Sequence, residues 1–131
     1  MANSFRGRGN LGAAPVLRHT ESNGESLSVV NLRVYFDRPK PDGDGGFEDK
    51  GGFWMNVAYW GRNAENIARL LRKGSRIFVD GELLESSWTD RESGEIHTQV
   101  EIRALHVDLD PGKIASIEWL ISETRDDEAE S

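Results

Sequence analysis

Two tryptophans six residues apart, in a segment that alternates like a β-strand, are the side chains in this sequence best suited to bind a flat ligand. In the segment Phe53–Trp60, the face that begins with Phe53 carries a good core set of apolar residues. The opposite face carries Trp54, Asn56, Ala58 and Trp60. Because so small a protein cannot bury both faces of the strand, we expect the two indoles to point outward.

Outward indoles are unfavourable in water unless something covers them. In the neighbouring alternating segment, 26–36, Arg33 and Tyr35 also lie on the outer face, and Trp88 comes near the end of a later strand, just before a turn. These side chains predict a platform on which nucleic-acid bases stack, because every base offers a π-face, worth roughly 1–3 kcal/mol per base. The alternative is that the two indoles are covered by a second subunit or by the loop 37–52.

Basic residues could supply phosphate contacts to such a platform. The net charge is −7, but residues 110–131 alone carry −5, which leaves −2 for residues 1–109. The predicted DNA-binding set is Trp54, Trp60, Trp88, Arg33, Tyr35, Asn56, Arg62, Arg72, Lys73 and Arg76. For the basic side chains on the helix, the alternative is an ordinary solvated face.

Other chemistries find no support in the sequence. There is no Cys, and the three His residues have no metal-ligand spacing. The Gly-rich run at 7–12 matches a dinucleotide fingerprint, but it lacks the preceding strand and following helix that the motif needs. The acidic run at 42–46 has Phe53 where a calcium loop needs a bidentate Glu. We therefore expect no enzyme activity, no catalytic residues, no metal and no cofactor.

The elements that position these residues follow from periodicity. Strands are expected over 26–36, 53–60, 76–84 and 98–109, and residues 62–73 have helical spacing, with Asn63 as N-cap and Gly74 as stop. Residues 37–52 are too polar to pack and predict a long mobile loop. This element order is that of an all-β, five-stranded OB-fold barrel with one short helix between strands 3 and 4.

The chain divides into a predicted barrel domain at 1–109 and a short C-terminal tail at 110–131. In the tail, Ile114–Ile121 is expected to be helical and to dock on the barrel, and the acidic residues after it are expected to be disordered. No apolar run reaches the length of a membrane span, and the polar N-terminus is not a signal peptide. We expect a soluble cytoplasmic, nucleoid-associated protein with no membrane partner.

Several short motifs, in their order and spacing across residues 3–109, resemble the bacterial-type single-stranded DNA-binding proteins. The matching pieces are Gly9–Gly12 with Pro15 and Arg18, then 54–61, 71–75, 79–83 and 88–90 with Gly94. The resemblance implies an OB fold, a homo-oligomer (usually a tetramer) and sequence-nonspecific binding of single-stranded DNA in replication, recombination and repair. It also places stacking residues at Trp54, Trp60 and Trp88.

Two departures from that family pattern bear on partners. The place of the family's apolar first strand reads Phe5-Arg6-Gly7-Arg8, which leaves a dimer or an altered tetramer open. The C-terminus keeps the family's acidity without its Pro-Phe tip, so contacts to replication and repair proteins through the tail stay open too. The alternative function is a primosome-type OB protein that acts mainly by bridging other proteins.

Overall fold

The computed structural model describes residues 3–120, and five of its strands close into a barrel. These strands are β1 (Phe5–Leu11), β3 (Glu25–Phe36), β6 (Phe53–Trp60), β7 (Arg76–Thr89) and β8 (Ile96–Leu109). Around the barrel they follow the order β1-β7-β8-β6-β3, and β3 pairs back with β1 to complete the ring. All pairs are antiparallel except β6–β8. The predicted all-β, five-stranded barrel is therefore confirmed.

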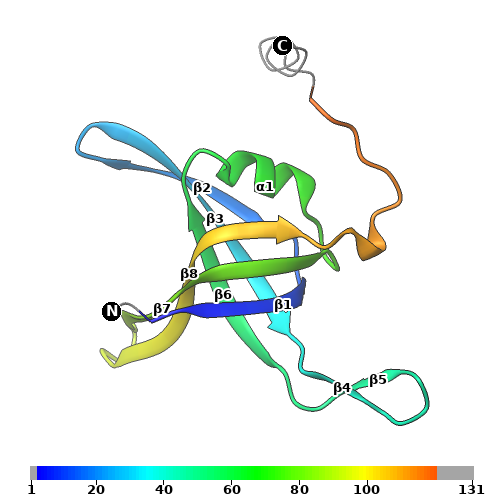
Figure 1. The fold of residues 1–131 in the computed structure, drawn as a ribbon. Helices are drawn as coiled ribbons and strands as arrows, with labels where there is room; N and C mark the ends of the chain where they lie inside the picture. Colours follow the sequence, from blue (N-terminus) through cyan, green and yellow to red (C-terminus); the bar gives the residue numbers. More distant parts are fainter. Residues whose placement is uncertain (1–2, 121–131) are drawn as a thin grey trace.

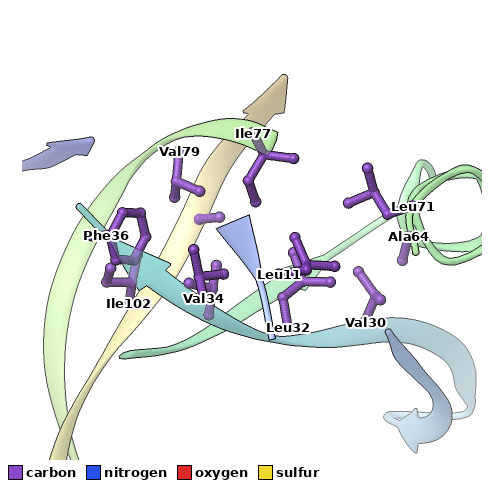
Figure 2. Packing of buried hydrophobic residues seen from close by; sticks show 12 residues of the cluster. Leu11, Val30, Leu32, Val34, Phe36, Ala64, Leu71, Ile77, Val79 and Ile102 are labelled. Carbon is purple, nitrogen blue, oxygen red and sulfur yellow. The ribbon is translucent and has the colours of Figure 1, made fainter. Parts of the chain in front are cut away.

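The helix α1 (Ala64–Leu70) connects the third and fourth barrel strands and lies over one end of the barrel (Figure 1). It is shorter than the predicted 62–73, because the chain leaves the helical conformation at Leu71 to insert that side chain into the core. Asn63 stands at the N-cap position, but its side chain makes no capping hydrogen bond. Figure 2 shows Ala64 and Leu71 closing the core beside Val30 and Leu11.

The core is built from the inner faces of the barrel strands. The predicted inner face of β3, which is Val30, Leu32, Val34 and Phe36, is fully buried (Figure 2). On β6 the prediction holds for Val57 and fails for Phe53, which is 48% exposed. Phe53 starts its strand at the barrel's edge, where its ring lies beside the rings of Phe5 and Phe36.

Strand β1 forms despite its arginines and glycines. It pairs with β7 from Phe5 to Asn10, and the Arg6 guanidinium lies 5.9 Å from the centroid of the Phe78 ring. A side chain at Gly9 would collide with the backbone carbonyl of Tyr35. The glycine therefore lets β1 approach β3 closely enough to close the barrel.

Two strand pairs were not expected from the sequence. Strand β2 (Val16–Ser22) forms a hairpin with β3, and Asn23 and Gly24, both at positive φ, make its turn. Residues 37–52, predicted as a long mobile loop, contain two short strands, since β4 (Pro39–Pro41) and β5 (Phe47–Asp49) pair as a small arm. The arm extends from the end of the barrel where β3 ends and β6 begins (Figure 1). The Asp42 carboxylate organises its turn by accepting hydrogen bonds from the Asp44 and Gly46 amides at 2.8 and 3.1 Å.

The segment after β8 also differs from expectation. A short 3-10 helix, η1 (Pro111–Lys113), is followed by residues 114–120 without helix. Trp119 is 80% exposed and Leu120 is 92% exposed, so the predicted docking on the barrel is wrong for these residues. So short a segment gains too few hydrogen bonds to form a helix without packing against a neighbour. Ile121 and the predicted acidic tail lie outside the described residues.

Within residues 3–120, no helix combines the length and apolarity needed to span a bilayer.

Candidate nucleic-acid interface

The outer face of the β3–β6 pair brings four of the predicted residues together. In the register of these strands, Tyr35 lies opposite Trp54 and Arg33 lies opposite Asn56. The Tyr35 and Trp54 rings are tilted by 59°, with centroids 5.3 Å apart. Trp54 is 48% exposed, so part of its indole is held by a neighbouring ring while part faces solvent. We call Arg33, Tyr35, Trp54 and Asn56 the platform.

Arg33 links the two strands of the platform. Its guanidinium lies 5.6 Å from the centroid of the Trp54 ring, within the range of a cation–π interaction. The same side chain donates a hydrogen bond from Nη1 to Asn56 Oδ1 at 3.0 Å. Arg33 therefore fixes the platform and keeps a cation at its surface.

Gly12 completes the support of Trp54. A Cβ atom at this position would collide with the outer edge of the indole ring. The Gly12 amide also donates to the Arg33 carbonyl at 2.8 Å, which ties the end of β1 to β3. The absence of a side chain at Gly12 therefore makes the space that the indole occupies.

Trp60 stands at the other end of β6, on the same outer face. It stands six positions after Trp54, which corresponds to roughly 20 Å along a strand. Trp60 is 40% exposed and forms one wall of a shallow groove of about 420 Å³. The groove is also lined by Thr20, Leu27, Ala58, Leu84, Glu101, Ile102 and Arg103.

Trp88 lies near the tip of the β7–β8 hairpin. Its ring stacks on His97, the residue opposite it on β8, with centroids 5.5 Å apart and planes 27° apart. The turn that follows is held by Asp90, whose amide donates to the Glu95 carbonyl at 2.8 Å. With one side against imidazole, Trp88 remains 48% exposed.

Three of the predicted basic residues are exposed and free to meet an anion. Arg62 comes two residues after the end of β6, and Arg72 and Lys73 follow α1. Among residues 3–120, none of these three side chains makes an ion pair. Their positions are compatible with phosphate contacts beside Trp60 and at the helix end.

Arg76 has a different environment from the other predicted basic residues. Its guanidinium donates two hydrogen bonds to the Asp37 carboxylate, at 2.8 and 3.1 Å, and lies 3.5 Å from Asp110 Oδ2. Hydrogen bonding to Asp37 raises the pKa of Arg76 above its ordinary value, and the Coulomb attraction of both acids acts in the same direction. Arg76 thus ties β7 to the base of the arm and to the end of β8, and its donors are already occupied.

Sequence reasoning missed three contributors to this surface. His97 behind Trp88 and Gly12 behind Trp54 are supports that appear only once strand register is known. The groove beside Trp60 depends partly on Leu27, which the β2–β3 hairpin positions. The Asn-Gly pair at 23–24 was the signal that could have indicated that hairpin.

No cluster of three or more His, Asp or Glu side chains suited to a metal ion occurs in the described part of the chain.

Comparison with known proteins gives one consistent result. The model of the single-strand binding protein family matches residues 3–110. The chain is 33% identical over 101 residues to single-stranded DNA-binding protein 1 of Xylella fastidiosa, covering 77% of this chain and 71% of that protein. It is 36% identical over 96 residues to the single-stranded DNA-binding protein of Mycolicibacterium smegmatis, covering 72% and 55%. The match thus spans little more than half of the mycobacterial relative.

The fold is similar to that of a solved structure, the small single-stranded DNA-binding protein from Streptomyces coelicolor. The two share 21% identity at a TM-score of 0.67, over 84% of this chain and 95% of the other. At that identity the likeness concerns the fold, and it supports the assignment of the barrel as an OB-type barrel.

Proposed function

The chain belongs to the single-strand binding protein family, and we propose that it binds single-stranded DNA without sequence preference. The observation that carries this proposal is the outward pair Trp54 and Trp60 on β6, with Arg33 beside the first indole. In a protein with a small core, such exposed rings are best explained by a ligand that covers them. Stacking suits single strands, because their bases are unpaired and every base has a π-face.

The proposed mechanism combines stacking with charge. Bases stack on Trp54, Trp60 and Trp88, while Arg33, Arg62, Arg72 and Lys73 neutralise phosphates. Asn56 holds Arg33 in place through the hydrogen bond at 3.0 Å. We leave Arg76 out of this set, because its guanidinium is engaged by Asp37 and Asp110. No step of this mechanism is catalytic, and none requires a metal or cofactor.

A titration of intrinsic tryptophan fluorescence with poly(dT), at low and high salt, tests this proposal. Stacked indoles are expected to lose emission, and the affinity should fall as salt rises, since binding releases counterions from the phosphates. Unchanged emission at micromolar protein would contradict the proposal.

The alternative function, bridging of other proteins, is favoured by one observation. Trp119 and Leu120 are almost fully exposed beyond the barrel, in a place where a partner could cover them. This alternative predicts weak DNA binding, so the same titration separates the two functions. The expected homo-oligomer, the contacts with replication and repair proteins and the cytoplasmic location stay predictions of the same proposal.

A further inference from the structure

The groove beside Trp60 reaches from the barrel face to the β7–β8 hairpin. Trp60 and Ala58 of β6 form one wall, and Leu84, Glu101 and Arg103 of the hairpin form the other. Its lining is therefore mostly apolar, with one aromatic wall and charged groups on one side. These are the features that a nucleotide requires, since it carries a flat base, an apolar sugar face and a phosphate.

Beyond the groove, the outer face of the hairpin leads from Leu84 to Trp88. On β7, Trp88 comes four positions after Leu84, so their side chains lie on the same side of the strand, roughly 13 Å apart along it. On β8, their partners in register are Glu101 and His97. The wall of the groove and the Trp88–His97 stack thus belong to one continuous surface.

Arg103 is the cation on this surface. On β8 it lies between two neighbouring strands, opposite Ala58 of β6 and opposite Glu82 of β7. In the part of the chain that the structure describes, Arg103 makes no ion pair, although Glu82 and Glu101 are its neighbours on the same face. Its donors are therefore available to a ligand, and the nearby acids oppose an anion there.

We propose that single-stranded DNA passes from Trp60 through this groove to Trp88, with Arg103 donating to a backbone phosphate. Leu27 and Leu84 then contact the base or the sugar of the nucleotide that lies in the groove. The inference rests on the proposed function, and it adds a phosphate ligand and a path between two stacking residues. DNA is the occupant because the groove begins at one proposed stacking residue and leads to another.

Opposite charge changes on β8 test this inference. The plot of log affinity against log salt has a negative slope. Arg103→Gln should make this slope shallower by about 0.7, the value expected for one phosphate of a single strand. Arg103→Lys should restore most of that slope. Glu101→Gln should tighten binding about twofold to fivefold at low salt, because it removes a charge that repels the phosphate.

Two matched variants control for a general change in net charge. Lys113→Gln removes an exposed cation in η1, and Asp108→Asn removes an acid on β8 outside the groove. Both should leave affinity and salt slope near those of the wild type. If the wild type binds dT oligonucleotides and Arg103→Gln behaves like Lys113→Gln, the groove is not on the DNA path and only this inference fails. If the wild type itself does not bind, the proposed function fails and this inference fails with it.

Discussion

Tyr35 and Trp54 face each other across the β3–β6 pair, with their ring centroids 5.3 Å apart and their planes tilted by 59°. The tilt keeps the two rings out of the parallel face-to-face arrangement, which aromatic pairs disfavour. Arg33 lies 5.6 Å from the same indole. Trp54 is therefore held in place before any ligand arrives, which lowers the entropy lost when a base stacks on it.

Tyr35→Ala removes that support and should weaken binding of dT oligonucleotides about twofold to tenfold, the equivalent of one aromatic pair. Tyr35→Phe keeps the ring and is the matched control, expected to bind like the wild type. The measurement is a fluorescence titration of each variant. Equal affinity for Tyr35→Ala and Tyr35→Phe would show that the ring does not position Trp54.

Gly12→Ala places a methyl group where the edge of the Trp54 indole lies. The indole is exposed and can swing outward, so we expect little loss of stability and a severalfold loss of DNA affinity. Ala13→Ser, at the exposed neighbouring position, controls for a change in this segment. Comparison of thermal midpoints and oligonucleotide affinities tests the prediction. A large drop in the midpoint with unchanged affinity would count against it.

Arg76→Gln should lower the free energy of unfolding by about 2 kcal/mol, because it leaves two carboxylates that are largely removed from solvent without their shared cation. Arg76→Lys should recover only part of this loss, since an ammonium group cannot make both hydrogen bonds to Asp37. Urea unfolding measures the change. A variant with wild-type stability and a reduced salt slope for DNA binding would instead make Arg76 a phosphate ligand.

His97→Ala removes the ring on which Trp88 stacks. We expect the indole to become more mobile and DNA binding to weaken about twofold to fivefold. Ile96→Ala is the matched control, because Ile96 is an exposed neighbour that projects from the opposite side of β8. Acrylamide quenching and DNA titration of the two variants give the comparison. Identical behaviour of both variants would mean that the stack has no role in binding.

The periodicity of apolar residues along the sequence was sufficient to predict most of the barrel strands. Alternation on β3 and β6 placed Val34 inside and Trp54 outside because a strand side chain has only two faces to choose from. Helical spacing found α1, and its true ends depended on where Leu71 enters the core. The closure of β1 on β3 was not predictable in this way, because it depends on contact between backbones distant in sequence at Gly9 and Tyr35.

The remaining differences come from one local turn and from contacts between residues distant in sequence. Residues 37–52 look too polar to fold, yet a turn organised by Asp42 is enough to pair two three-residue strands. Arg76 looked like a member of a basic cluster along the chain, and in space it belongs with Asp37 and Asp110. Sequence spacing does not give the register between strands. The register of β7 and β8 places Trp88 beside His97, and the pairing of β8 with β6 places Arg103 in the groove.

The most direct test of the account is the affinity of the double variant Trp54→Ala, Trp60→Ala for a dT oligonucleotide at fixed salt. Trp119→Ala, which removes an exposed indole outside the barrel, is the matched control. In single-strand binding proteins each stacked base contributes about 1 kcal/mol or more to binding. Loss of one stacked base at each of the two sites should therefore weaken the affinity of the double variant at least about 25-fold. The control should bind like the wild type. A double variant with wild-type affinity would show that the outward face of β6 is not where this protein holds DNA.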